Sequence, residues 1–102
     1  LVGNKFTGTF ADIGGFSLNY HKHINTGEGG VVVTNSNLLA KKVRLIRNHG
    51  MFDRDTITIM GCNSRLDTIQ AIVGNWLIPH TTDIANQRIK NAKYYDDGLD
   101  KL

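Results

Sequence analysis

Short apolar runs separated by glycine and polar clusters make up the first third of the chain. Gly15–Leu18 is compatible with a short strand, and Val31–Thr34 is a continuous β-branched run that predicts a buried strand. Between them, residues 19–25 are polar and rich in histidine, which predicts a loop. Thr26–Gly30 predicts a tight turn, because glycine adopts backbone angles that other residues avoid. Val31–Val33 is apolar on both faces, which is typical of a strand inside a larger sheet that helices cover.

The next segment has helical periodicity. A helix is expected to begin at Asn35 or Ser36, whose side chains can cap it, and to close at Gly50. Residues 51–62 are interpreted as a connection that contains a short strand at Thr56–Met60.

Two further helices are predicted in the remainder of the chain. The first spans Leu66–Leu77, with Ser64 as its N-cap and Pro79 as its stop. The second begins at Thr82 or Asp83 and continues toward the chain end. The apolar stripe of the first consists of Leu66, Ile69, Val73, Trp76 and Leu77.

Composition narrows the class of protein. The 102 residues are 40% apolar and 21% charged, as in an ordinary globular chain. No apolar run approaches the ~20 residues of a membrane helix, so no membrane partner is expected. The one cysteine, Cys62, cannot form an internal disulfide, which favours a reducing, cytoplasmic setting. The formal charge of +3 is spread over several elements without an aromatic and basic platform, so no nucleic-acid partner is expected.

Because the chain begins in mid-pattern at Leu1, we interpret it as a piece of a larger protein.

Candidate chemistry is concentrated around one lysine. Lys22 follows Ser17 by five residues and lies between His21 and His23, just before the glycine turn. A lysine amine becomes a nucleophile when burial or a neighbouring cation lowers its pKa, and glycine-loop amides together with a serine hydroxyl can bind a phosphate. The alternative is a solvated loop lysine, and spacing alone does not decide between the two. The two histidines have no third ligand close in sequence, so no metal site is predicted.

The segment around Lys22 resembles the cofactor-lysine motif of the DegT/StrS-type sugar aminotransferases, which bind pyridoxal phosphate. In that family a Phe-Ser pair precedes the lysine by the same spacing, and a Thr-Gly-Glu-Gly-Gly turn and an apolar strand ending in Thr-Asn follow. The corresponding residues are Phe16-Ser17, Lys22, Thr26–Gly30 and Val31–Asn35.

The resemblance continues in the same order through nearly the whole chain. Arg47–Gly50 matches an Arg-Asn-His-Gly helix ending, and Gly61–Asp67 matches a Gly-x-Asn-x-Arg-(Leu/Met)-Asp signature. Gln70-Ala71 matches the Gln-Ala pair that follows it, and Ala92–Leu99 is similar to the helix leading toward a smaller C-terminal domain.

This resemblance implies an α/β fold, part of the large domain of a fold-type I aminotransferase. Residues 1–80 would be the C-terminal part of that cofactor-binding domain, and residues 81–102 would be the helix leading to the small domain. The implied cofactor is pyridoxal 5'-phosphate, which Lys22 would hold as an imine before acting as general acid and base. Ser17 would bind its phosphate, and Asn63 would reach that phosphate from the neighbouring subunit of a homodimer with shared active sites.

The implied reaction moves an amino group, commonly from glutamate, to a keto group of a nucleotide-linked sugar, for products such as surface polysaccharides. The family's pyridine-nitrogen partner and ring-stacking residue have no counterpart in these residues, so the 102-residue chain alone is expected to be inactive.

Two alternatives remain open. The first is a sugar-nucleotide 3-dehydratase of the same fold, which carries histidine in place of the lysine. The spacing from Ser17 assigns that position to Lys22 and not to His23, which disfavours it. The second is a non-catalytic regulatory or interaction protein on this scaffold.

Three other residues carry open interpretations. Glu28 is expected to tie down the glycine turn, with contact to substrate as the alternative. His49 is equally compatible with a substrate contact and with a favourable position at a helix C-terminus. Arg65 is equally compatible with binding an anion across an interface and with pairing to Asp67 or to the chain nearby.

Overall fold

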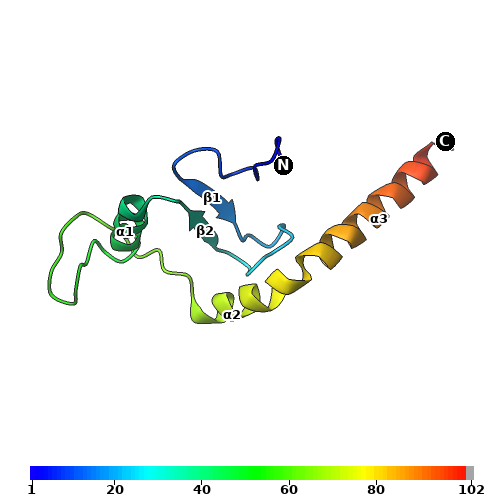
Figure 1. Ribbon diagram of the computed structural model, residues 1–102. Coiled ribbons are helices and arrows are strands. Elements are labelled where there is room, and N and C mark those ends of the chain that lie inside the picture. Colours follow the sequence, from blue (N-terminus) through cyan, green and yellow to red (C-terminus); the bar gives the residue numbers. More distant parts are fainter. Residues whose placement is uncertain (101–102) are drawn as a thin grey trace. The chain divides into compact units, whose positions relative to one another are not determined.

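The computed structural model describes residues 1–100, in which two strands precede the helices (Figure 1). The chain divides into two units, of which the first comprises residues 1–17 and 30–67 and the second comprises residues 18–29 together with residue 68 onward. In chain order the elements are β1 (Gly14–Ser17), β2 (Gly30–Val33), α1 (Asn37–Ile46), α2 (Thr68–Leu77), the 3₁₀ turn η1 (Ile78–His80) and α3 (Thr81–Leu99).

The two predicted strands form an antiparallel pair in the first unit. Gly14 lies opposite Val33, and Ser17 lies opposite Gly30. Both strands begin one residue earlier than the sequence predicts. The burial predicted for the second strand is absent, because the described sheet has only two strands, and Val31 and Val32 remain 43% and 51% exposed.

Helix α1 starts as predicted and ends earlier than predicted. Its N-cap is Ser36, whose hydroxyl accepts a hydrogen bond from the Leu39 N–H at 3.3 Å. Its last helical residue is Ile46, four residues before the predicted stop at Gly50. The helix ends there because the chain turns away through His49, a residue with left-handed φ of 60°, to meet a later segment.

That later segment crosses the end of α1 and pairs with it. Asn48 and Asn63 form an isolated antiparallel bridge, and the His49 N–H donates to the Cys62 carbonyl at 2.9 Å. Gly61 lies so close to this crossing that a Cβ there would lie 2.3 Å from the Gly50 nitrogen. The strand predicted at 56–60 is wrong: a single bridge joins Ile57 to Met51, and the rest of this stretch is loop.

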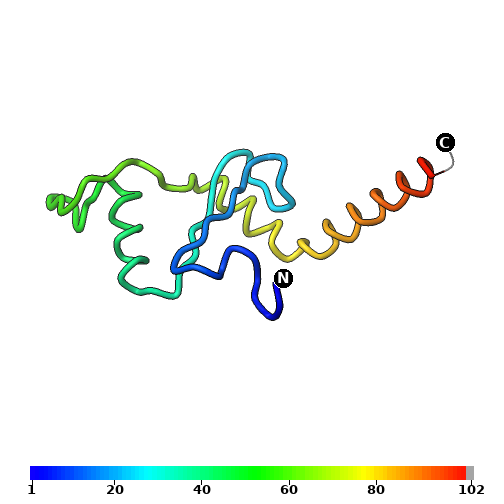
Figure 2. Tube along the Cα trace, turned by 90° about the horizontal axis from the view of Figure 1, so that it is seen from above, coloured from blue at the N-terminus to red at the C-terminus, as the bar shows by residue number. Residues whose placement is uncertain are grey.

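The second unit contains a run of helices that follow one another almost without interruption (Figure 2, yellow to red). Helix α2 begins at Thr68, so the predicted start at Leu66 and the predicted cap at Ser64 are wrong. The physical reason is that the Ser64 N–H donates to the Arg47 carbonyl at 2.9 Å, which holds this stretch in the crossing instead of a helical turn.

Pro79 ends α2 less abruptly than predicted. It lies within η1, where proline at the start of a helical turn loses no hydrogen bond, and α3 then begins at Thr81, one residue earlier than expected. Two residues of the predicted α2 stripe are largely exposed, Ile69 at 73% and Trp76 at 67%, because no described element covers them. Within residues 1–100, none of the helices combines the length and apolar character needed to cross a bilayer.

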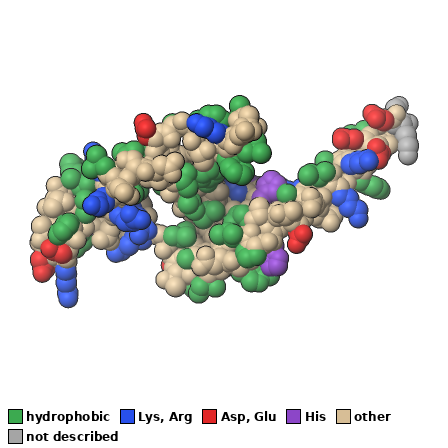
Figure 3. All heavy atoms as spheres, in the orientation of Figure 1, with side chains coloured by type: hydrophobic (Ala, Val, Ile, Leu, Met, Phe, Trp, Pro, Cys, Tyr) green, Lys and Arg blue, Asp and Glu red, His purple; other side chains and the backbone are tan. Residues whose placement is uncertain are grey.

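Charged side chains are distributed unevenly over the surface (Figure 3). Basic side chains gather over α1, which carries Lys41, Lys42 and Arg44. Acidic and basic side chains are mixed along α3, as is usual for a solvated helix surface (Figure 3).

Candidate functional site

Lys22 lies at a turn within the loop formed by residues 18–29, called here the lysine loop. The Asn19 side-chain oxygen accepts from the His21 N–H at 3.2 Å, and the Asn19 carbonyl accepts from the Lys22 N–H at 2.9 Å. Asn19 therefore fixes the backbone on which Lys22 stands. The Lys22 side chain itself is exposed, so its amine is accessible to a small molecule.

The two ends of the lysine loop are joined at its base. The Leu18 N–H donates to the Gly29 carbonyl, and the Thr26 N–H donates to the Leu18 carbonyl, each at 2.9 Å. Leu18 and Thr26 are also buried, with 9% and 8% of their surfaces exposed. Gly27, with φ of 84°, makes the sharp turn that brings these ends together, in a conformation that favours glycine.

Helix α2 supports the lysine loop from a distant part of the sequence. The Gln70 side-chain amide donates to the Glu28 carbonyl at 2.6 Å, across a separation of 42 residues. The same carbonyl accepts from the Thr26 hydroxyl at 2.9 Å. Gly74, the buried residue of α2, lies under the Thr26 methyl group, which would be 3.3 Å from a Cβ at that position.

Glu28 has the structural role expected for it. Its carboxylate accepts from the Asn19 side-chain amide at 2.7 Å, and its carbonyl is the acceptor for Gln70. Both contacts tie the glycine turn to its surroundings. The Asn19 contact links Glu28 directly to the residue that positions Lys22.

Asn63 lies in the first unit, on the segment that crosses the end of α1. Arg65 donates through Nε to the Asn63 side-chain oxygen at 3.2 Å and through Nη1 to the Asn48 side-chain oxygen at 2.9 Å. Arginine has only donors, so this contact engages the oxygen of Asn63 and leaves its NH₂ group to donate elsewhere. Arg65 thus interacts with the chain nearby, the second of the two roles considered for it.

Ser17 is the last residue of β1, and its side chain is exposed. Ser17 and Asn63 therefore belong to the first unit, and Lys22 belongs to the second. Ser17 ends β1, and Lys22 lies in the loop that follows this strand. Asn63 lies far from both in the sequence, and its position is set by the bridge to Asn48.

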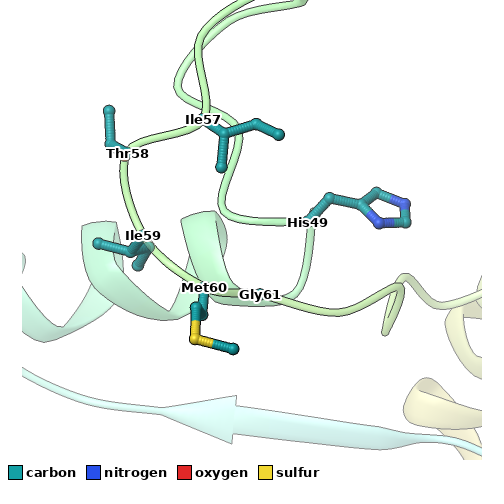
Figure 4. A pocket seen from close by; sticks show the side chains of 6 residues that line it. All are labelled: His49, Ile57, Thr58, Ile59, Met60 and Gly61. Carbon is teal, nitrogen blue, oxygen red and sulfur yellow. The ribbon is translucent and has the colours of Figure 1, made fainter.

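A separate shallow hollow of about 490 Å³ lies in the first unit. His49 lines it together with residues 57–61. Figure 4 shows the His49 ring pointing away from the side chains of Thr58 and Ile59. The hollow contains none of Ser17, Lys22 and Asn63.

On the neighbouring loop, hydrogen bonds from the Thr56 hydroxyl and then from the Asp55 N–H lower the pKa of Asp53.

Sequence reasoning missed the contribution of Gln70, Gly74 and Thr26. Gln70 stands out in the sequence only as part of the Gln-Ala pair, and nothing local indicates that its side chain meets Glu28. Within residues 1–100, no three histidine, cysteine or acidic side chains lie close enough together to hold a metal ion.

Comparison with known proteins identifies the family of this chain. The model of the DegT/DnrJ/EryC1/StrS aminotransferase family matches residues 2–102. The chain is 35% identical to a UDP-N-acetyl-3-dehydro-alpha-D-glucosamine 3-aminotransferase from Acidithiobacillus ferrooxidans, over 96% of this chain and 27% of that protein. It is also 35% identical to a GDP-perosamine synthase from Caulobacter vibrioides, again over 96% of this chain and 27% of that protein.

A solved structure is similar to this chain in both fold and sequence. Helicobacter pylori PseC, an aminotransferase involved in the biosynthesis of pseudoaminic acid, matches with a TM-score of 0.84 and 37% identity, over 92% of this chain and 26% of that chain. The chain thus spans about a quarter of the length of the relatives it matches. The likeness confirms the predicted fold class, an α/β part of a fold-type I aminotransferase large domain. By sequence and by fold, the chain belongs to the DegT/DnrJ/EryC1/StrS aminotransferase family.

Proposed function

We propose that these residues are part of an enzyme that transfers an amino group, with glutamate as donor, to a keto group of a nucleotide-linked sugar. The observation that carries the proposal is the placement of Lys22, with an accessible side chain on a braced turn, in a chain of this family. The names of two relatives support the substrate class, since one acts on a UDP-sugar and the other makes a GDP-sugar. Because these nucleotides differ, the proposal extends to the class and not to one nucleotide.

The side chains present fit pyridoxal 5'-phosphate as the cofactor. Lys22 offers an accessible primary amine that can hold an aldehyde, and Ser17 offers an exposed hydroxyl for the phosphate. Asn63 offers NH₂ donors, because Arg65 occupies its oxygen. When bound, the cofactor supplies a conjugated ring that stabilises negative charge next to the reacting nitrogen.

The chain's own residues would then divide the work. Lys22 would hold the cofactor through Nζ and, once released, carry a proton on Nζ to and from the reacting carbon. Ser17 and Asn63 would anchor the phosphate and so limit movement of the ring. We assign the Asn63 contact to a neighbouring subunit, which makes a homodimer with shared active sites part of the proposal.

We also propose how the chain is divided between domains. Residues 1–80 would belong to the cofactor-binding domain, and residues 81–102 would lead to a smaller domain. Helix α3, which begins at Thr81, would be the helix that leads to it.

The test is an absorbance titration of the full-length protein with pyridoxal 5'-phosphate. We expect the yellow band of a lysine-bound cofactor in the native protein and in the control Lys42→Ala, whose lysine lies on the exposed surface of α1. Lys22→Ala should lack the band. Glutamate should bleach it in the native protein, and a keto-sugar nucleotide should restore it.

A band that persists in Lys22→Ala would refute the assignment of Lys22. Absence of the band from the native protein would refute the aminotransferase proposal and leave the dehydratase or the regulatory protein as the explanation.

A further inference from the structure

The position of an exposed lysine amine depends on the backbone that carries it. A lysine side chain has four flexible carbons, so a loop that moves takes the amine with it. The hydrogen bonds that Asn19 makes to His21 and Lys22 are local, and they shape the turn without attaching it to a rigid element. Attachment requires contacts from outside the lysine loop.

Those contacts come from one side of α2. Gln70 donates to the Glu28 carbonyl at 2.6 Å, and Gly74 lies one helical turn further on, against the Thr26 methyl group. Residues four apart share a helix face, so the donor and the small residue present one surface to the lysine loop. We name this surface, Gln70 with Gly74, the α2 clamp.

The clamp is connected to Lys22 by a short chain of contacts. Gln70 holds the Glu28 carbonyl, and the Glu28 carboxylate accepts from the Asn19 side-chain amide at 2.7 Å. Asn19 in turn holds the Lys22 N–H through its carbonyl. A side chain on α2 is therefore three hydrogen bonds away from the backbone of Lys22.

We infer that Gln70 is a positioning residue for Lys22, because it anchors the lysine loop to α2 through Glu28. Gly74 assists by leaving room for Thr26. The inference rests on the proposed function only in taking Lys22 as the residue that holds the cofactor. Removal of the Gln70 donor should loosen the loop without unfolding α2, because the glutamine amide makes this contact at an exposed position.

The first arm of the test needs no cofactor. Amide hydrogen exchange is measured in the cofactor-free full-length protein for Gln70→Met, which keeps the length and helix propensity of the side chain but removes its donor. The amides of Leu18, Lys22 and Thr26 should exchange about two- to tenfold faster, the range expected for loss of one net hydrogen bond. Exchange within α2 should be unchanged.

The matched control is Gln87→Met on α3. Gln87 is also a helical glutamine whose side-chain hydrogen bond lies at an exposed position, and it donates to Asn91 at 3.0 Å and not to the lysine loop. Its variant should exchange like the native protein at the three loop amides. Equal exchange rates of the loop amides in Gln70→Met and Gln87→Met would show that Gln70 does not anchor the lysine loop, whether or not Lys22 holds the cofactor.

The second arm separates positioning from general damage. Pyridoxine 5'-phosphate keeps the ring and phosphate of the cofactor but, as an alcohol, cannot bond to an amine. Gln70→Met should bind this analogue as the native protein does, while its Lys22-dependent absorbance band forms at least severalfold more slowly with pyridoxal 5'-phosphate. Unchanged band formation, or equal weakening for both compounds, would overturn the positioning role.

The two proposals fail in different ways. If the native protein shows no Lys22-dependent band, the proposed function falls, and the exchange arm still decides the clamp. If the band is present and the loop amides of Gln70→Met exchange at the native rate, the clamp falls and the function stands.

Discussion

Arg65 determines which end of the Asn63 side chain takes part in the local structure. Its guanidinium engages the oxygens of both Asn63 and Asn48, so the Asn63 amide cannot rotate without losing a hydrogen bond. An amide whose NH₂ group is held in one direction is a preorganised donor, which raises affinity by lowering the ordering cost of binding. The oxygen side of the same group serves only the local structure.

Replacement of Asn63 by aspartate should separate these two roles. Asn63→Asp keeps an oxygen for Arg65 but replaces the donor with a negative charge. We expect the affinity of the full-length protein for pyridoxine 5'-phosphate to fall about tenfold or more, since hydrogen bonds to charged groups are worth about 1.5–3 kcal/mol. The free energy of unfolding should be preserved, and fluorescence titration with urea unfolding checks both.

The control for this change is Asn75→Asp, which adds the same charge at an exposed position of α2. It should leave phosphate affinity unchanged. An Asn63→Asp protein that binds the analogue as tightly as the native protein would contradict the role given to Asn63.

Among the elements, α1 and the segment that crosses its end depend on close backbone contact. Gly61 lies where a Cβ would be 2.3 Å from the Gly50 nitrogen and 2.6 Å from the Ile46 carbonyl oxygen. Those neighbours are backbone atoms, which cannot rotate away as side chains do. Gly50 is also closely surrounded by backbone atoms of this crossing, and its φ of 73° is in the left-handed region that favours glycine.

A methyl group at Gly61 should therefore disrupt the crossing. We expect Gly61→Ala to lower the free energy of unfolding by more than about 1 kcal/mol, because alanine is incompatible with the space available. Gly15→Ala is the matched control, since a Cβ at Gly15 meets nothing within 4 Å. Urea unfolding of the full-length protein measures both, and equal midpoints for the two variants would refute the explanation.

At the scale of the whole molecule, the described chain buries very little apolar surface. Leu18 is the buried hydrophobic residue among residues 1–100, while Val32 of β2 and Trp76 of α2 are more than half exposed. Burial of apolar side chains is the main favourable contribution to folding, and it must offset the entropy lost by each ordered residue. The chain also spans about a quarter of the length of its relatives.

We therefore expect the isolated 102-residue chain to fold poorly. Its circular dichroism should change gradually on heating, without the cooperative transition of a packed domain, and its amide proton resonances should be narrowly dispersed. A sharp melting transition with well-dispersed resonances would show that these residues form a sufficient core by themselves.

The sequence was enough to recognise the elements and the family, because both depend on residues close together along the chain. The strand runs, the Ser36 cap and the spacing from Ser17 to Lys22 are local patterns of this kind. Contacts between distant segments determined the rest. The crossing of Asn48 with Asn63 ends α1 early and delays the start of α2, and Gln70 reaches Glu28 across 42 residues. Such contacts leave no mark in local periodicity, since their hydrogen bonds form only when tertiary folding brings the segments together.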